Sequence, residues 1–381
     1  MRYLYGSECL LNVLKSLFFI GAATHILQDS NSLFLFGLTL LFEVFSSVVA
    51  PFSVGVFIDK KGGIVVYKRL MLILMVLLGA LWGIHSWFSP VVYLFLAYSC
   101  LSFFSPLQRM AQQTYFAEAR EQFDLKKINT HHQIAVQVGQ LAALGLSVVL
   151  VDTVDFSYLH LGGLACLALA FWCATRLPTL HHATHRGQLV PFRQLIRSFP
   201  LISKALIVVS AFDYVLMSVF NLSLPVLAQS YAQKGQTISY FDMAYAAGAL
   251  CLSWLLPHFF ANKPNLKLSQ FAYVLLPFLF VGLVPDTMFI WRMVLIFSLG
   301  ALITLSTIGF NSHLQATLPK EVVGRVFALR RIVLGFLLLI TINGLSWQYK
   351  NGLELYYFTL CAVIFLLSIV LMTVLFYKKE S

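Results

Sequence analysis

Charged residues are scarce in this chain. Only 11% of its 381 residues are Asp, Glu, Lys or Arg, whereas 59% are hydrophobic. A soluble domain carries about 25% charged residues because its surface faces water. The shortage of charge therefore excludes an ordinary soluble protein of this length, and it predicts that most of the surface faces lipid.

Motifs for catalysis and metal binding are also missing. The sequence has no P-loop, no H-E-x-x-H and no G-x-S-x-G, so we expect neither an ATPase nor a hydrolase. The six cysteines lie in apolar stretches without a C-x-x-C pair, which favours small buried side chains over metal ligands. His181, His182 and His185 lack acidic or cysteine neighbours, so a solvated loop is favoured over a metal site. We expect no cofactor and no enzymatic activity.

Twelve apolar stretches are present, each near the roughly 20 residues that a helix needs to cross a bilayer. The first six are predicted near 9–27, 33–57, 69–87, 91–110, 131–152 and 157–175. The other six are predicted near 202–229, 239–260, 269–285, 288–310, 329–348 and 354–377. The connections between the third and fourth stretches, and between the ninth and tenth, are short enough that each pair could also form one long helix. The sequence thus predicts an all-α polytopic membrane protein.

Lys and Arg are distributed unevenly among the predicted loops. If the N-terminus is inside, the outer loops contain only Lys234, Arg292 and Lys350, and all other loop cations lie inside. The positive-inside rule then predicts that both termini are cytoplasmic. The net charge of +11 is explained by this topology, so no nucleic-acid partner is expected.

The longest inner loop, about 176–200, divides the chain into two groups of six predicted helices. We expect an N-terminal bundle at 1–175 and a C-terminal bundle at 201–381. Pro51 and Pro257 end the second and eighth predicted helices, each before an inner loop, which hints at an internal repeat. Two six-helix halves related by a parallel repeat are a known transporter plan.

The loop after the second predicted helix has a recognisable pattern. Gly55 is followed four residues later by Asp59, then by Lys60 and Gly62. This pattern resembles the signature loop of the major facilitator superfamily, although Lys60 stands where Arg is commoner. The resemblance implies alternating access and a contact that latches the inner side in one transport state, in which Asp59 caps a helix or pairs with an Arg. The implied latch comprises Gly55, Asp59, Lys60, Gly62, Arg109, Gly324 and Arg325.

Two further stretches resemble the enterobactin-exporter and macrolide-efflux branch of this superfamily. One is Phe-Ser-Pro-Leu-Gln-Arg-Met-Ala at 104–111, and the other is 311–326, where Gln315, Pro319 and Gly324 recur at the branch's spacing. Asn221 in the seventh helix also fits. The resemblance implies proton-coupled efflux of a siderophore or a bulky drug across the bacterial inner membrane by a monomer.

Other functions stay open at this point. The fifth helix lacks the Gly-Pro motif that many efflux members carry, which leaves import of an iron-siderophore or a lipid-like substrate as an alternative. Multidrug efflux is another alternative. A membrane sensor is a remote one, since no loop is long enough for an output domain.

Three charged residues within the predicted spans are the candidates for the transport pathway. Charge at the centre of a membrane helix costs roughly 2.5–3.5 kcal/mol, so it usually faces a cavity or a partner. Asp213 is the first candidate proton carrier, with a hydrogen bond to a neighbouring helix as an equal alternative. Glu43 is the second, with a pair to Lys15 as its alternative. Lys15 could instead attract an anionic substrate, or extend to the interface.

The fifth predicted helix carries a polar stripe. Gln133, Gln137 and Gln140 follow Asn129 at helical spacing, so they share one face. Polar stripes in lipid face other helices. This stripe therefore either lines the transport cavity or joins a helix pair.

Overall fold

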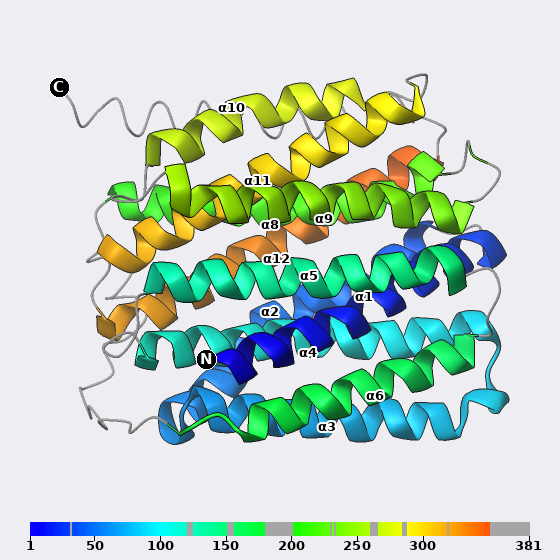
Figure 1. Cartoon of the computed structure of the whole chain (residues 1–381), viewed down its shortest axis with the longest axis horizontal. Coiled ribbons are helices and arrows are strands. Elements are labelled where there is room, and N and C mark those ends of the chain that lie inside the picture. The colour runs from blue at the N-terminus through cyan, green and yellow to red at the C-terminus, as the bar shows by residue number, and fades with distance from the viewer. Residues whose placement is uncertain are drawn as a thin grey trace.

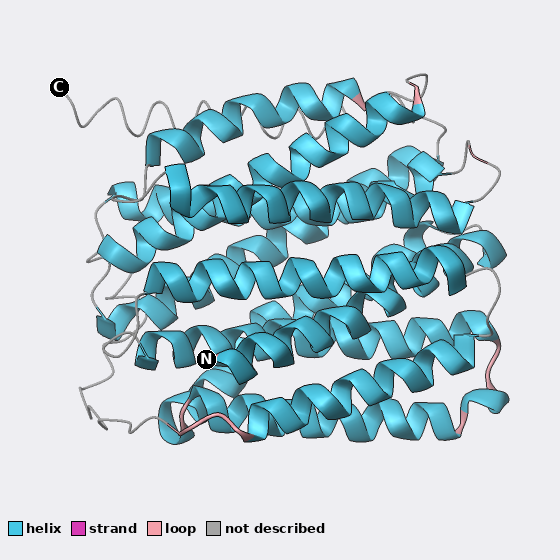
Figure 2. Cartoon of the chain, viewed as in Figure 1, coloured by secondary structure: helices cyan, strands magenta, loops and turns pink. Residues whose placement is uncertain are grey.

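In its described part, the computed structural model consists of helices joined by short loops and turns (Figure 2). It describes residues 1–30, 33–119, 125–150, 156–179, 201–228, 231, 234–259, 266–283, 288–317 and 320–350. The helices of the N-terminal part are α1 (Arg2–Ser30), α2 (Leu33–Lys61), α3 (Gly63–Gly83), α4 (Pro90–Ala119), α5 (Leu125–Leu150) and α6 (Phe156–Thr175), with a 3₁₀ turn η1 (His85–Trp87) before α4. The helices of the C-terminal part are α8 (Leu201–Ala228), α9 (Lys234–Phe259), α10 (Leu266–Gly282), α11 (Phe289–Thr317) and α12 (Lys320–Lys350).

These helices confirm the first eleven predicted spans, and the twelfth, 354–377, lies outside the described residues. One prediction about helix limits needs correction. The first helix begins at Arg2 rather than near residue 9, so it is longer than the apolar run alone indicated. The third and fourth stretches are separate helices as predicted, because Gly83 ends α3 and Pro90 begins α4. In the described residues, α1, α3, α4, α5, α6 and α11 are long and apolar enough to cross a membrane.

The helix contacts form two groups with the same pattern (Figure 1). In the N-terminal group α1 packs on α5, α2 on α4 and α3 on α4. In the C-terminal group α8 packs on α12, α9 on α11 and α10 on α11, which are the corresponding pairs of a repeat. The groups meet along two helix pairs, α5 with α9 and α2 with α12. We call these pairs the α5–α9 seam and the α2–α12 seam.

Two glycines bring α9 and α11 into close contact. A Cβ atom on Gly248 of α9 would collide with the carbonyl oxygen of Phe297 on α11. A Cβ atom on Gly300 of α11 would collide with the carbonyl oxygen of Tyr245 on α9. Small residues let membrane helices approach to backbone contact, where dispersion forces are strongest. The pair α9–α11 is therefore held by a reciprocal glycine contact.

The turn between α2 and α3 contains the second half of the predicted signature loop. Gly62 has a φ of 88°, a left-handed conformation that glycine adopts without strain. The first backbone N–H of α3, at Gly63, donates a 3.0 Å hydrogen bond to Oε1 of Glu118 at the end of α4. Glu118 thus caps α3, a role that the sequence analysis allowed for Asp59. The side chain of Asp59 lies outside the described residues.

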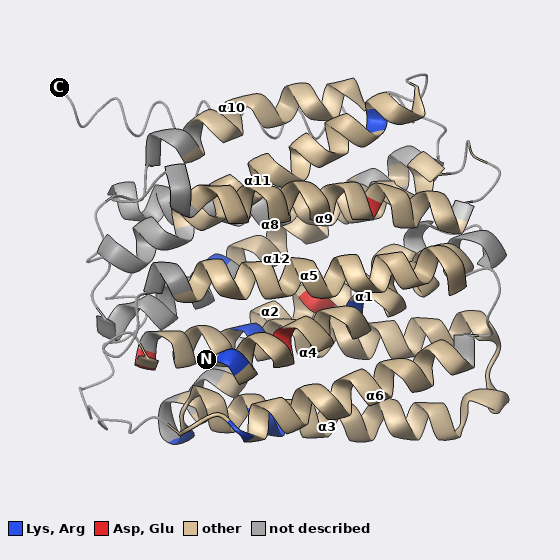
Figure 3. Ribbon diagram, viewed as in Figure 1, with Lys and Arg blue, Asp and Glu red and all other residues tan. Residues whose placement is uncertain are grey.

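Several of the described Lys and Arg residues lie toward one end of the bundle (Figure 3). This is the end where α1 begins and where α2 gives way to α3, and we call it the basic end. Arg2, Lys61, Arg69 and Arg176 are all exposed there. Arg292 lies in the first turn of α11, toward the opposite end. The asymmetry is the one that the loop charges predicted.

Candidate functional site

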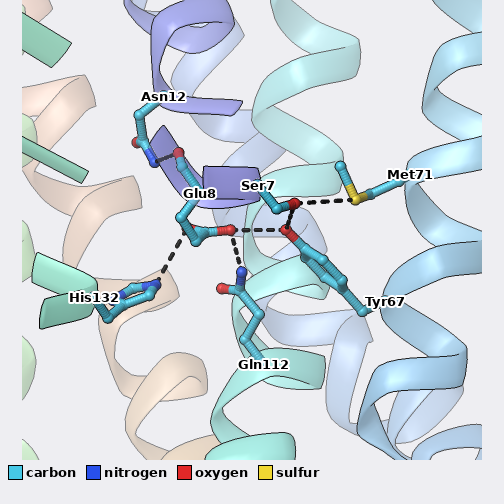
Figure 4. A network of polar contacts seen from close by, with 7 residues as sticks. All are labelled: Ser7, Glu8, Asn12, Tyr67, Met71, Gln112 and His132. Carbon is cyan, nitrogen blue, oxygen red and sulfur yellow. Dashed lines mark hydrogen bonds and ion pairs between the residues drawn. The ribbon is translucent and has the colours of Figure 1, made fainter. Parts of the chain in front are cut away.

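A carboxylate lies buried among four helices of the N-terminal half, at Glu8 of α1 (Figure 4). Tyr67 of α3 donates a 2.8 Å hydrogen bond to Glu8 Oε1, and Gln112 of α4 donates Nε2–H to the same oxygen. His132 of α5 places Nε2 at 3.2 Å from Glu8 Oε2. Only 3% of Glu8 is exposed, so these contacts replace the water that the carboxylate loses.

The same cluster continues on α1 and α3. Ser7 Oγ lies 3.2 Å from Tyr67 Oη and donates to Met71 Sδ at 3.9 Å. Asn12 donates Nδ2–H to the backbone carbonyl of Glu8 at 2.8 Å, within α1. A buried network whose members are bonded fixes the relative position of its helices. The Glu8 cluster thus ties α1, α3, α4 and α5 together in the half of α1 nearer the basic end.

Lys15 lies two helical turns further along α1 and is half-buried. Its ammonium group is attracted by the carboxylates of Glu8 and Glu43 and repelled by Arg109 of α4. The sequence analysis left open whether Lys15 pairs with Glu43. The structure places Lys15 within the influence of Glu43 and adds Glu8 as a second negative neighbour, so its charge is balanced by two acids.

A second buried carboxylate lies where the two halves meet. Asp242 of α9 is 2% exposed, and Gln140 of α5 donates a 2.9 Å hydrogen bond from Nε2 to Asp242 Oδ1. Closer to the opposite end, Ser147 of α5 and Ser239 of α9 have their hydroxyl oxygens 3.2 Å apart. Tyr98 of α4 interacts electrostatically with Asp242 and also with Glu43 of α2. Two polar contacts therefore cross the α5–α9 seam.

The polar stripe of α5 meets α9 at Gln140, through the hydrogen bond to Asp242. Gln137 is 3% exposed, and its Oε1 has no hydrogen-bond partner among the described residues. Gln133 is half-buried. On α4, Gln108 is 1% exposed, and neither polar atom of its side chain has a partner within the described part of the chain. A buried amide group without a partner costs free energy, so Gln108 and Gln137 are suited to contact a polar ligand or water.

The other predicted residues are placed less completely. Asn221 is half-buried in α8, and Arg109 is half-buried in α4. Asp213 falls within α8, but its side chain lies outside the described residues. Gly55, Asp59 and Lys60 fall within α2, and Gly324 and Arg325 fall within α12, but their burial and contacts are outside what the structure describes. The loop with His181, His182 and His185 is outside the described residues entirely.

Four buried charges were missed in the sequence analysis, and one of them, Arg330, was counted with the inner-loop cations but is 2% exposed in α12. Glu8 stands just before the predicted first span, and only the longer α1 places it inside the bundle. Asp242 falls within the span predicted at 239–260, so its burial could have been expected. Arg292 was assigned to an outer loop but is 1% exposed in α11. Its Nη1 donates a 2.9 Å hydrogen bond to Tyr231 Oη, and its guanidinium lies 5.5 Å from the Tyr231 ring centroid.

The family of the protein follows from comparison with known proteins. The model of the Major Facilitator Superfamily matches residues 9–342, so the chain belongs to that superfamily. It is therefore a multi-pass membrane transporter rather than an enzyme. No curated protein sequence is significantly similar to it.

Solved structures share its fold across nearly the whole chain. A variant of the nucleoside transporter NupG matches with a TM-score of 0.69 and 14% identity, covering 98% of this chain and 99% of its own. The D-xylose-proton symporter matches with a TM-score of 0.68 and 14% identity, covering 96% of both chains. The proton:xylose symporter XylE bound to 6-bromo-6-deoxy-D-glucose gives 0.67 and 13%, covering 97% and 95%. These likenesses confirm the predicted major facilitator fold.

Proposed function

We propose that this transporter exports a siderophore or a similar bulky organic molecule in exchange for protons, by alternating access. The sequence stretches 104–111 and 311–326, which resemble siderophore and macrolide exporters, support the cargo class and the direction. The major facilitator fold supports the mechanism, in which two helix bundles rock around a site near the middle of the bilayer.

The observation that carries proton coupling is the position of Asp242. Its carboxyl group is buried between the halves, and the hydrogen bond from Gln140 is its contact across the seam. A carboxyl group that loses water takes up a proton more readily, because burial disfavours the charged form. A proton bound there neutralises a charge at the surface along which the halves meet, so protonation and rearrangement of the halves are linked.

The pathway we propose joins predicted and observed residues. Lys15, with Glu43 nearby, attracts the anionic groups of the substrate, and Gln133, Gln137 and Gln140 face it from α5. Asn221 and Asp213 complete the pathway from α8. Bundles at 1–175 and 201–381 move relative to each other around the segment 176–200.

We further propose that the basic end faces the cytoplasm of a bacterial cell. The exposed cations Arg2, Lys61, Arg69 and Arg176 at that end support this orientation under the positive-inside rule. Both termini are then cytoplasmic, the membrane is the inner membrane, and the transporter works as a monomer.

Import on the same fold is the second candidate. It is favoured by the similar solved structures, since one is named a D-xylose-proton symporter and another a nucleoside transporter. The unpaired amide of Gln108 and the unpaired Oε1 atom of Gln137 would suit a neutral, hydroxyl-rich substrate of that kind. Multidrug efflux is a third candidate. A pump for cationic drugs should have buried carboxylates whose charge no neighbouring cation neutralises, whereas Lys15 partly neutralises Glu8 and Glu43.

Disruption of the gene tests the cargo and the direction together. Cells grown without iron are separated from their medium, and siderophore is measured in both fractions. A fall in the medium with accumulation inside the cells is expected for an exporter. Normal secretion with lost growth on supplied iron-siderophore would show import instead. If neither changes, iron transport is ruled out, and the drug sensitivity of the same strain separates multidrug efflux from the remaining alternatives.

A further inference from the structure

The two seams between the halves are built from different chemistry. The α5–α9 seam contains the Asp242–Gln140 hydrogen bond and the Ser147–Ser239 contact. In the α2–α12 seam, Gly335 of α12 packs against valines of α2. A Cβ atom built on Gly335 would lie 2.8 Å from Val48 Cγ2. One seam is therefore polar and contains a buried acid, whereas the described contact of the other is apolar and close.

The polar contacts of the α5–α9 seam lie toward the opposite end. Ser147 is three residues before the end of α5, and Ser239 is five residues after the start of α9. Asp242 lies eight residues into α9, about 12 Å from its first residue at 1.5 Å per residue. If the seam opened at the two serines, water entering there would be about one helical turn away from the Asp242 carboxyl group.

The groups around Asp242 determine what its ionisation does. The neutral amide of Gln140 faces it from α5, and Tyr98 interacts with it from α4. Among the described residues, the charged groups on two other helices that pack on α9 have contacts elsewhere: Lys15 of α1 interacts with Glu8 and Glu43, and Arg292 of α11 bonds to Tyr231. The helix α8 also packs on α9, and the side chains of its Lys204 and Asp213 lie outside the described residues. When Asp242 is ionised in the closed seam, the hydrogen bond donated by Gln140 is therefore the contact from α5 that stabilises its charge.

We propose that the α5–α9 seam is a proton-controlled contact, in which Gln140 acts as the positioning residue for Asp242. The seam stays closed while Asp242 carries its proton, and it opens at the opposite end when the proton leaves. The α2–α12 seam stays closed in both states and acts as the pivot. This inference rests on the proposed proton coupling through Asp242 and adds the place where the halves separate.

The chemistry of an amide suits this role. Gln140 can donate to the carboxylate, and after a rotation of its amide it can accept the proton of the carboxylic acid. The protonated and ionised forms of Asp242 still differ in free energy, because burying the ionised form is costly. On insertion scales for a carboxylate at the membrane centre, loss of the proton changes the ratio of open to closed seam by roughly a hundredfold. The hydrogen bond from Gln140 to the ionised form reduces that factor.

Disulfide cross-linking across the seam tests the proposal. The pair Ser147→Cys with Ser239→Cys replaces hydroxyl oxygens 3.2 Å apart, a separation from which a disulfide can form. A protease site placed in 176–200 separates the halves after the reaction, so cross-linked protein keeps its full size on a non-reducing gel. The protein with its native cysteines alone gives the background.

An added oxidant takes up the two electrons that the thiols lose, and the rate is measured from about pH 5 to about pH 9, the range over which a buried carboxyl group titrates. Thiols react as thiolates, whose fraction rises with pH, so each rate is divided by the rate of a reference cysteine pair at the same pH. We expect this ratio to fall at least about tenfold as the pH rises. In Asp242→Asn, which mimics the protonated form, the ratio should keep its low-pH value throughout. Gln140→Leu removes the donor to the ionised form, so the total fall should be larger, and Gln140→Asn should restore part of the difference. A purely structural role for Gln140 would instead lower the rate equally at every pH.

The reference pair is Val48→Cys with Gly335→Cys in the α2–α12 seam, whose rate should follow the thiolate fraction alone and should not depend on Asp242. A ratio of the two rates that does not change with pH, or that falls equally in Asp242→Asn, would overturn the proposal. A reference rate that changes when Asp242 is replaced by Asn would overturn it as well. If Asp242→Asn nevertheless abolishes proton-driven transport, the proposed function stands and only the moving seam is wrong. If the cross-linking behaves as expected but gene disruption leaves siderophore secretion intact, the seam stands and the cargo is wrong.

Discussion

The hydroxyl group of Tyr67 donates a 2.8 Å hydrogen bond to the carboxylate of Glu8, although the two residues are 59 positions apart in the chain. Both residues are almost completely buried. The bond fixes α3 to α1 at the point where α4 and α5 also contact the same carboxylate. The stability of the N-terminal half should therefore depend on this one contact.

Replacement of Tyr67 by Phe tests that dependence. The ring stays, so packing is retained, but the carboxylate loses a donor. Hydrogen bonds to charged groups contribute about 1.5–3 kcal/mol, so we expect a lower midpoint of thermal unfolding in detergent. Tyr3→Phe is the control, because Tyr3 is 48% exposed and should tolerate the change. Equal midpoints for the two variants would show that Tyr67 is held by packing alone.

The capping carboxylate of Glu118 offers a second test. Its Oε1 accepts the Gly63 N–H at 3.0 Å, at the positive end of the α3 dipole. Glu118→Ala should cost about 1 kcal/mol of stability, as the loss of a helix cap does. Glu118→Gln keeps an acceptor and should lose less. If both variants match the unchanged protein in thermal unfolding, the contact does not stabilise the turn.

Because α9 packs closely on α11, adding one methyl group at Gly248 should lower the stability of the protein strongly. Gly248→Ala places a Cβ atom against the Phe297 carbonyl oxygen, so the two helices must move apart. Overpacking of this kind costs about 1–3 kcal/mol. Gly79→Ala is the matched control, because a Cβ atom there meets no other atom within 4 Å. Detergent extracts of the two variants are compared by size-exclusion chromatography and thermal unfolding, and equal behaviour would contradict the reciprocal contact.

Asp242→Asn should abolish proton coupling, while the variant still folds and reaches the membrane in normal amounts. In the disrupted strain, the variant is expected to restore no more siderophore secretion than an empty plasmid does, while immunoblots show normal abundance in the membrane. A protonophore added to cells with the unchanged transporter should have the same effect, since it collapses the proton gradient. Full secretion by Asp242→Asn would mean that another group carries the proton.

The charge of Lys15 should matter for anionic cargo. Lys15→Ala is expected to lower export of a carboxylate-type siderophore, because an attractive charge in the pathway is lost. Lys68→Ala is the control, since Lys68 at the start of α3 donates to the carbonyl oxygens of Thr175 and Leu177 near the basic end. Unchanged anion export by Lys15→Ala would rule out the electrostatic role.

The sequence predicted most of the fold because long apolar runs need no tertiary context to be recognised. It predicted less of the site because the decisive contacts join distant positions. Gln140 and Asp242 are 102 residues apart, and His132 and Glu8 are 124 apart. A polar stripe on α5 was visible, but nothing local in the sequence indicates which helix it meets. Glu8 was overlooked for a different reason, since the apolar run that marks the first span begins after it.

The reciprocal glycines of α9 and α11 have a mechanical consequence. Each helix lies against the backbone of the other at two places, at Gly248 and at Gly300, so neither can slide or rotate alone without a collision. The pair must move as one rigid body. A displacement that begins at Asp242 in α9 is therefore carried directly to α11, and with it to Arg292 and Tyr231 at the opposite end of the bundle.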